Sequence, residues 1–246
     1  MSLTHEAPDF RTYTMDYRNP HAELEPAADE IAAVDAALRA LKERGMLAHV
    51  SYDSARFDAH RAAVQQHFEI PWTAITPRMQ RLLYAINAIA QPQTMVAVGV
   101  FCGNTFISNA GAGAGPGACY RAQRLVGIEI VPEEAARARR NVAAIDPEGR
   151  AEVIAADGIV WLREFTGTID LLYIDANAKG PGKGIYLDIL RAGWHCLRPG
   201  SLVLAHNSFN LASSLADYLN YVRDPSVMQE SVNLVIDGEG LEVSLR

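Results

Sequence analysis

The sequence predicts an α/β fold with an open, mostly parallel seven-stranded sheet, a C-terminal antiparallel hairpin and a helical N-terminal cap. After residue 92, short β-branched runs without a polar face alternate with helical stretches. Such runs are typical of buried parallel strands, and their alternation with helices indicates βαβ units. The tail over residues 231–246 differs, because two alternating segments flank Asp237-Gly238-Glu239-Gly240, which is a hairpin signal. A parallel sheet that ends in a hairpin is a specific architecture.

The individual elements follow from the same patterns. The expected strands lie at residues 94–101, 124–131, 151–157, 169–175 and 200–207, with helices between them at 132–144, 159–165 and 184–197. Helical spacing upstream predicts three more helices at residues 25–45, 54–68 and 77–89, the last with Thr76 as N-cap and Pro77 at its first position. The chain therefore divides near residue 70, into an N-terminal lid with cap helices (1–70) and a ligand-binding domain (71–246).

Composition narrows the classes of function. The 246 residues include 22 Lys and Arg against 29 Asp and Glu, and the net charge of -7 argues against a nucleic-acid binder. With 49% hydrophobic residues, the chain is globular rather than disordered or fibrous. Three scattered cysteines, a polar N-terminus and the lack of an apolar run of about 20 residues predict a reduced, cytoplasmic protein with no membrane partner.

Polar side chains and glycines recur at five successive strand ends. They are Gly99 and Gly103 after the first strand, Glu129 after the second, Asp157-Gly158 after the third, Asp175 after the fourth and His206-Asn207 after the fifth. Ligands of open α/β sheets bind beyond the carboxyl ends of the strands, where glycines admit a ligand to the backbone and a carboxylate grips ribose hydroxyls. Each group alone also has a structural explanation, such as a turn or a helix cap. Their conjunction favours one binding site.

Several segments, in register and in order, carry a family resemblance. They are ITPRMQRLL ahead of VAVGVFCGNTF, then GIEIVPE, AADG, DLLYIDAN, LRPGSLVLAHN and the closing IDGEGLEVSLR. Residues 71–246 thereby resemble Rossmann-like class I S-adenosylmethionine (SAM) methyltransferases of the catechol and caffeoyl-CoA O-methyltransferase type. The resemblance implies a SAM site formed by Gly99, Phe101, Gly103, Glu129 (ribose), Asp157 (adenine edge), Gly158 and Asp175. A plain dinucleotide-binding enzyme fits less well, because G-x-G-x-x-G is absent and a terminal hairpin is out of place there.

Three positions depart from that family's pattern. Its first motif normally carries an acid that holds the cofactor's ammonium group, and Ala97 stands in that place. Its divalent metal is bound through an Asp and an Asp-Asn pair, but here His206 precedes Asn207. The lysine that deprotonates a catechol is replaced by Ala178, with Lys179 one step out of register. Because hard cations prefer oxygen ligands, we expect no metal.

One reaction accounts for all three departures. Without a carboxylate at position 97, the amine of SAM, whose ordinary pKa is about 7.7–8.0, is easier to deprotonate. The free amine can attack its own γ-carbon and expel methylthioadenosine, which converts SAM as substrate to azetidine-2-carboxylate. The chain in this respect resembles azetidine-2-carboxylate synthases. We interpret it as such a cyclase, with His206 or Asp175 as proton acceptor and Asn207 orienting the amine.

Aromatic side chains are candidates to hold the sulfonium through cation–π contacts. They are Tyr173, Phe101, Tyr13 and Tyr17. The first two also have a simple packing explanation. The stretch TYTMDY holds more aromatic residues than disordered tails usually carry, so we expect the N-terminal segment to be a lid that closes over the cofactor.

Two other functions stay open. One is a metal-independent SAM-dependent methyltransferase that acts on a small-molecule hydroxyl or amine, with His206 as its general base. The other is a protein that binds SAM without catalysis. In every case the partner is a small molecule, and a homodimer through N-terminal helices such as residues 29–44 is a further expectation.

Overall fold

An eight-stranded sheet runs through the computed structural model, which describes residues 3–72, 75–177 and 183–246. The strands are β1 (Leu3–Glu6), β2 (Thr94–Val98), β3 (Arg124–Glu129), β4 (Ala151–Ala155), β5 (Ile169–Ile174), β6 (Leu197–His206), β7 (Glu230–Val235) and β8 (Leu241–Leu245). Their spatial order is β1-β7-β8-β6-β5-β2-β3-β4. The chain reverses its direction of travel across the sheet between β4 and β5, so the ends of β2 and β5 lie side by side.

The direction of each strand confirms the predicted mixed sheet. Strands β2 to β6 pair in parallel, whereas β8 is antiparallel to both of its neighbours, β6 and β7. The turn at Asp237–Gly240 therefore closes the hairpin that the alternating tail predicts. Asp237 stabilises this turn, because its carboxylate accepts hydrogen bonds from the backbone N–H groups of Glu239 and Gly240.

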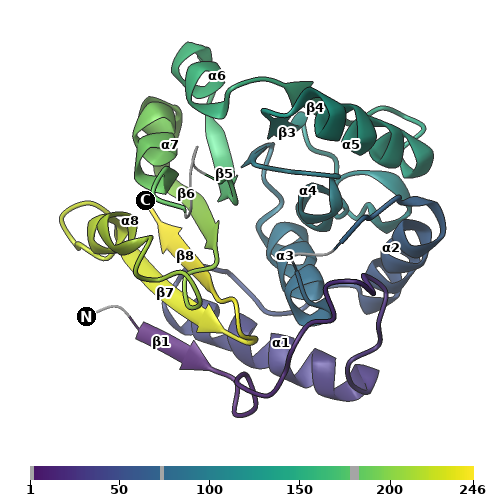
Figure 1. Ribbon diagram of the computed structural model, residues 1–246. Coiled ribbons are helices and arrows are strands. Elements are labelled where there is room, and N and C mark those ends of the chain that lie inside the picture. Colours follow the sequence, from purple (N-terminus) through teal and green to yellow (C-terminus); the bar gives the residue numbers. More distant parts are fainter. Residues whose placement is uncertain (1–2, 73–74, 178–182) are drawn as a thin grey trace.

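The expected count of seven strands is wrong by one. The eighth strand, β1, lies at the edge of the sheet and pairs in parallel with β7, with Leu3 opposite Val232 (Figure 1). Its sequence, LTHE, is largely exposed and shows no apolar alternation. The pairing uses backbone groups, so it leaves no pattern in the side chains from which it could be predicted.

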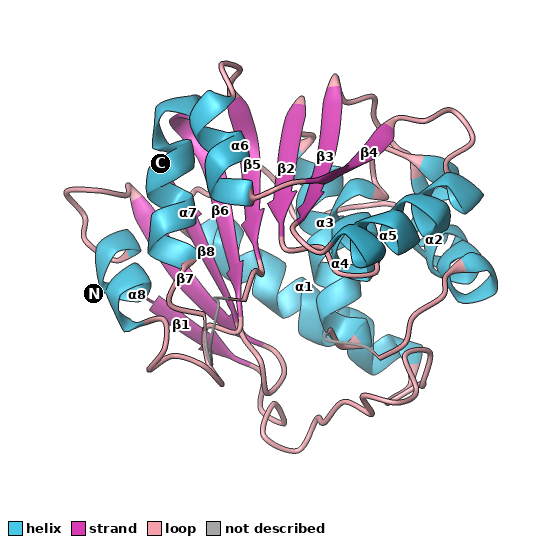
Figure 2. Ribbon diagram, turned by 45° about the horizontal axis from the view of Figure 1, so that its top comes forward, coloured by secondary structure: helices cyan, strands magenta, loops and turns pink. Residues whose placement is uncertain are grey.

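Helices cover both faces of the sheet (Figure 2). Their bounds are α1 (Ala27–Glu43), α2 (Ser54–His67), α3 (Pro77–Ala90), α4 (Asn104–Ala110), α5 (Pro132–Ile145), α6 (Gly158–Glu164), α7 (Tyr186–Gly193) and α8 (Ala216–Val222), with 3₁₀ turns at Gly115–Gly117 and Trp194–Cys196. One apolar core lies between the sheet and α1, α3, α4 and α5, and a second lies beneath α6, α7 and α8. The described helices include none long and apolar enough to span a membrane.

The three N-terminal helices agree with the sequence prediction to within a few residues. Thr76 caps α3 as expected, and its hydroxyl oxygen accepts the N–H of Met79 while donating to Asp237 of the hairpin at 2.6 Å. A hydroxyl that serves both partners joins the start of α3 to the turn between β7 and β8.

The segment before α1 is anchored to α3 and to the loop after β6. The buried guanidinium of Arg78 pairs with Asp9 at 2.8 Å and with Glu25 at 2.5 Å, and the ring of Phe10 packs edge-on against Phe209 at 5.1 Å. These contacts hold residues 3–25 along the main sheet. The domain boundary near residue 70 and the homodimer stay predictions.

Candidate functional site

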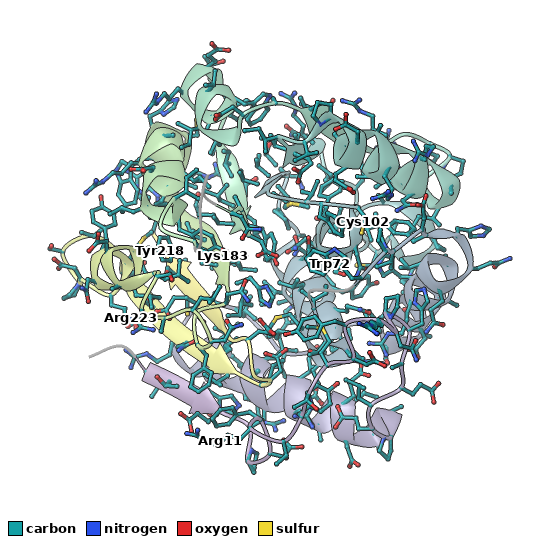
Figure 3. The ribbon with its side chains drawn as sticks, viewed as in Figure 1. Arg11, Trp72, Cys102, Lys183, Tyr218 and Arg223 are labelled. Carbon is teal, nitrogen blue, oxygen red and sulfur yellow. The ribbon has the colours of Figure 1, made fainter. Side chains whose placement is uncertain are left out.

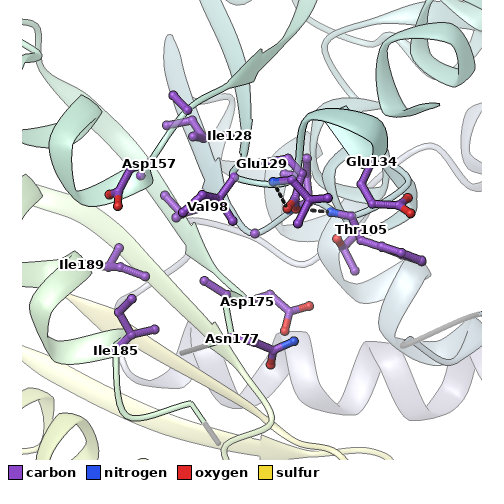
Figure 4. A pocket seen from close by; sticks show the side chains of 18 of the residues that line it. Val98, Thr105, Ile128, Glu129, Glu134, Asp157, Asp175, Asn177, Ile185 and Ile189 are labelled. Carbon is purple, nitrogen blue, oxygen red and sulfur yellow. Dashed lines mark hydrogen bonds between the residues drawn. The ribbon is translucent and has the colours of Figure 1, made fainter. Parts of the chain in front are cut away.

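A pocket of about 870 Å³ opens at the carboxyl ends of β2, β3, β4 and β5. Its volume suits a ligand of cofactor size. Figure 4 shows its polar groups, Glu129, Asp157 and Asp175, among apolar side chains, with Ile185 and Ile189 near α7 on one side. This is the place where an open α/β sheet binds its ligand. Of the predicted strand-end residues, Gly99, Glu129, Asp157, Gly158 and Asp175 line the pocket, whereas Gly103, His206 and Asn207 do not.

The turn after β2 forms the floor of the pocket. A side chain at Gly99 would place its Cβ 2.6 Å from the backbone of Ala176, and the φ of Gly99 is +84°. Glycine is therefore required here by the close approach of the β2 and β5 loops. Gly103 has a φ of +92° and lies against Ala138 of α5. Phe101, between them, also has a left-handed φ of +47°, a strained conformation for a residue other than glycine.

Glu129 fixes the shape of this turn. Its side chain is almost completely buried, and its Oε2 accepts the backbone N–H groups of Val100 at 3.2 Å and Phe101 at 2.8 Å (Figure 4). The other oxygen accepts the N–H of Val131 at 3.0 Å. Each carboxylate oxygen can accept more than one hydrogen bond, so Glu129 can still receive hydroxyl groups from a ligand.

Asp157 lines the pocket and also caps a helix. Its Oδ1 accepts the N–H groups of Ile159 at 2.8 Å and Val160 at 3.1 Å, both in the first turn of α6. The cap that the sequence analysis weighed as a structural explanation is thus real, and it orients the carboxylate at the pocket edge. Gly158 lies where a Cβ would meet Val98 at 2.4 Å, so its small size lets α6 approach β2.

Asp175 is the centre of a buried polar cluster beside the turn. Its carboxylate lies 3.3 Å from the Tyr173 hydroxyl, 3.4 Å from the Tyr186 hydroxyl and 3.5 Å from His206 Nδ1, and it accepts a hydrogen bond from Lys183. Burial raises the pKa of Asp175, but the Lys183 ammonium and His206 lower it by a larger amount. The resulting pKa is about 2. The carboxylate is therefore ionised at neutral pH.

Lys183 is a site residue that the sequence analysis missed. It lines the pocket, its side chain is 9% exposed, and it forms an ion pair with Asp175, eight positions earlier in the sequence. The resemblance directed attention to Ala178 and Lys179, which lie outside the described residues. A lysine between two glycines after a strand end is a signal, but spacing alone does not show that its ammonium returns to Asp175.

His206 and Asn207 lie behind this cluster and do not line the pocket. His206 is fully buried, and among the described residues neither of its ring nitrogens has a hydrogen-bond partner, although Nδ1 lies 3.5 Å from Asp175. Asn207, at a left-handed φ of 64°, donates through Nδ2 to Glu239 at 2.5 Å and to Asn210 at 3.2 Å. The amide of Asn207 thus faces the hairpin. The catalytic roles of both residues stay predictions.

The four aromatic candidates have different surroundings. Phe101 lines the pocket, and its ring lies 4.8 Å from that of Trp72, a pocket residue that the sequence analysis missed because it precedes the strand motifs. Tyr173 is fully buried in the core, and burial raises its pKa. Tyr13 packs against Arg78, whose guanidinium lies 3.9 Å from the ring, and Tyr17 donates to Glu239. Of the four, Phe101 is the one that the structure brings to the pocket.

The residues at the family's metal position do not fit a divalent cation. The ammonium of Lys183 lies against Asp175, and the amide of Asn207 is turned toward Glu239. Within the ranges that the structure describes, no three His, Cys, Asp or Glu side chains form a group that could hold a metal. A divalent cation beside Asp175 would also meet the positive charge of Lys183, which opposes binding.

Ala97, which stands where the family's first motif carries an acid, does not face the pocket. It is fully buried in the apolar core, and it does not line the pocket. Its strand neighbour Val98 does. The position therefore supplies no carboxylate to the pocket, as the sequence analysis noted, and its methyl group packs on the far side of β2.

Comparisons with known proteins agree with the fold. Residues 96–208 match a family model described as a methyltransferase domain. No curated protein matches the chain by sequence. The O-methyltransferase TomG from Streptomyces achromogenes, involved in tomaymycin synthesis and solved with SAM, is 20% identical, with a TM-score of 0.58 over 80% of this chain and 92% of its own.

Two further solved structures are similar over most of the chain. A Podospora anserina methyltransferase, PaMTH1, bound to S-adenosylhomocysteine (SAH), has a TM-score of 0.61 at 14% identity, over 92% of this chain and 99% of its own. An O-methyltransferase from Bacillus cereus, in complex with SAH, has a TM-score of 0.57 at 14% identity, over 88% of this chain and 100% of its own. At these identities the likeness shows that the chain has the class I methyltransferase fold.

Proposed function

We propose that the protein is a metal-independent SAM-dependent methyltransferase that acts on a small-molecule hydroxyl or amine. One observation carries the proposal. The same pocket holds Glu129 and Asp157 at adjoining strand ends and the Asp175–Lys183 pair on the other side of the Gly99 turn. The first pair suits a nucleoside, and the second suits a polar second substrate. The methyltransferase family match and the SAM- and SAH-bound structures of the same fold support this division.

The residues on the cofactor side fit SAM. Glu129 keeps accepting capacity for ribose hydroxyls, and Asp157 lines the pocket together with its apolar neighbour Ile159. The rings of Trp72 and Phe101 offer faces to a sulfonium. When bound, SAM supplies an electrophilic methyl group to the acceptor.

The chain's own contribution on the acceptor side is orientation and acceptance of a proton. Asp175 is ionised and lines the pocket, so it can accept a hydrogen bond from an acceptor hydroxyl or amine. His206 Nδ1 lies 3.5 Å behind it. We assign orientation of the acceptor's hydroxyl or amine to Asp175, which faces the substrate, and receipt of the proton that leaves the acceptor to His206.

A second candidate is cyclisation of SAM to azetidine-2-carboxylate. Position 97 lies on the far side of β2 and brings no carboxylate to the pocket, so β2 offers none to the amine of bound SAM. The amine nitrogen would then attack the γ-carbon, the carbon–sulfur bond would break, methylthioadenosine would leave, and the amine proton would pass to Asp175 or His206. The comparisons favour methyl transfer over this reaction.

One experiment separates these functions. The purified protein is incubated first with SAM alone and then with SAM and a panel of small phenols, alcohols and amines, and the products are measured by mass spectrometry. We expect SAH and a methylated acceptor in the second incubation and intact SAM in the first. Methylthioadenosine with equal azetidine-2-carboxylate from SAM alone would establish the cyclase. Failure of the protein to bind SAM or SAH in calorimetry would refute both.

A further inference from the structure

We infer that the carboxylate of Glu134 pairs with the ammonium group of bound SAM. The inference rests on the proposed function, and it assigns to α5 the contact that β2 does not offer. Glu134 lies in the first turn of α5, lines the pocket, and has a side chain that is 22% exposed. Figure 3, in the view of Figure 1, shows Lys183 toward α7 on one side and Cys102 toward α5 on the other. Glu134 therefore belongs to the side away from the Asp175–Lys183 pair.

Glu134 also lies where the amino-acid part of SAM would extend. Figure 4 shows Asp157 and Glu134 on opposite sides of Glu129, with Thr105 on the same side as Glu134. With the ribose at Glu129 and adenine toward Asp157, the sulfonium chain leaves on the far side, because the base and the C5′ carbon are attached across the ribose ring. The amino-acid group is thereby directed toward Glu134 and Thr105, whose hydroxyl can donate to its carboxylate.

The other carboxylates of the pocket already have tasks in the fold. Glu129 accepts backbone N–H groups of the β2 turn, Asp157 caps α6, and Asp175 is ion-paired. Glu134 receives Arg137 on Oε2 at 2.5 Å, and its Oε1 has no hydrogen-bond partner among the described residues. That oxygen is free to accept a hydrogen bond from a ligand.

The charge of the pocket matches a cationic group. Against the ammonium of Lys183, the described lining carries four carboxylates, those of Glu129, Glu134, Asp157 and Asp175. SAM has positive charges on its sulfonium and ammonium groups and one negative charge on its carboxylate. An ammonium group beside Glu134 is attracted by that carboxylate and by the acidic lining around it.

The pair also favours methyl transfer over cyclisation. A carboxylate that holds an ammonium group stabilises the charged form and raises its pKa. A protonated amine has no lone pair with which to attack the γ-carbon. Glu134 thus keeps the SAM chain intact until the methyl group is transferred.

The test compares SAH with its desamino analogue, in which hydrogen replaces the amino group and the carboxylate is kept. Binding of each to the full-length protein is measured by calorimetry at pH 7. We expect SAH to bind at least about tenfold more tightly than the analogue. Glu134→Gln should reduce this preference to less than about threefold, because it removes the charge and keeps the shape. Glu133→Gln is the matched control, since Glu133 is exposed on the same turn and does not line the pocket; it should keep the wild-type preference.

A second variant separates contact with the ligand from a role in the fold. Arg137→Met removes the cation that shares Glu134, and Arg137 does not line the pocket. If Glu134 binds the ammonium group, this variant keeps or raises the preference for SAH, because a competing cation is gone. If it loses the preference to the same extent as Glu134→Gln, the Glu134–Arg137 pair serves the fold and the inference is overturned.

Two other outcomes overturn the inference and leave methyl transfer standing. These are equal affinity of the wild type for SAH and its desamino analogue, and an unchanged preference in Glu134→Gln. Absence of a methylated product with every acceptor refutes the proposed function alone, since the preference for SAH is measured without an acceptor. Binding of neither ligand by the wild type overturns both.

Discussion

At the scale of single residues, the site depends on close backbone contact and on one buried charge. Gly99 lets the β2 turn lie against Asp175 and Ala176, and this contact places the carboxylate of Asp175 beside the turn. Glu129 holds the same turn through the N–H groups of Val100 and Phe101. The left-handed φ of Phe101 is stabilised by these bonds, which explains how a bulky residue occupies that conformation.

Substitution of Gly99 tests the importance of this contact. Gly99→Ala should lower the free energy of unfolding by about 3 kcal/mol or more, because it combines a positive φ with overlap against backbone atoms. Gly149→Ala is the matched control, since Gly149 also has a positive φ (+63°) but has nothing within 4 Å of an added Cβ. That variant should lose about 1 kcal/mol. Urea unfolding measures both, and equal losses would contradict the close-contact explanation.

The charge of Asp175 predicts a specific pH dependence. Its pKa is lowered to about 2 in the folded protein, so the carboxylate contributes stability above its ordinary pKa of 3.8 and loses it as the pH falls toward 2. The contribution is about 2 kcal/mol. Asp175→Asn should be less stable than wild type at pH 7, and the difference should shrink between pH 4 and pH 2. Unfolding curves across this range check the prediction; a constant difference would show that Asp175 is not ionised in the fold.

At the scale of elements, the N-terminal helices are joined to the domain by buried ion pairs. Glu30 of α1 pairs with Arg81 of α3 at 2.5 Å and with Arg61 of α2 at 2.7 Å. Arg81 is among the largest fully buried side chains. Burial raises the pKa of Glu30, but the two guanidinium groups outweigh it and lower the pKa overall. A single carboxylate thus fixes three helices relative to one another.

Removal of that carboxylate should be costly. Glu30→Ala leaves the buried charge of Arg81 with the exposed Asp58 as its remaining carboxylate, so we expect a loss of about 3–5 kcal/mol in the free energy of unfolding. Glu43→Ala, at the exposed end of α1, should change stability by less than about 0.5 kcal/mol. Thermal and urea unfolding measure both. A small effect of Glu30→Ala would mean that Asp58 and water satisfy Arg81 without α1.

At the scale of the whole molecule, the parts that the sequence predicts are those that depend on local patterns. The parallel sheet, the hairpin and the cap at Thr76 follow from periodicity and turn residues, and the strand-end residues Glu129 and Asp157 follow from topology. The parts that it missed depend on contacts between distant segments. Strand β1 pairs through its backbone alone, and Lys183 returns to Asp175 from a glycine-flanked position that no periodicity marks.

The N-terminal segment supplies both the edge strand β1 and a contact from Tyr17 to Glu239, and its deletion tests what it contributes. Described residues of 3–25 do not line the pocket, but Tyr17 donates to Glu239, which also accepts the amide of Asn207 beside the catalytic candidate His206. Deletion of residues 1–20 removes this contact, β1 and the partner Asp9 of Arg78. We therefore expect SAH affinity to change by less than about threefold and turnover to fall by at least about tenfold, as for a lid that closes the acceptor side.

A conservative variant separates a lid from general loss of stability. Tyr17→Phe removes the hydroxyl that reaches Glu239 and leaves β1 and the Asp9–Arg78 pair in place. If the segment acts through the position of Glu239 and Asn207, this variant should lower turnover in the same direction as the deletion, with an unchanged unfolding midpoint. If turnover survives the deletion itself, the segment contributes an edge strand and two anchors to the fold, and closure of the pocket must come from another part of the chain.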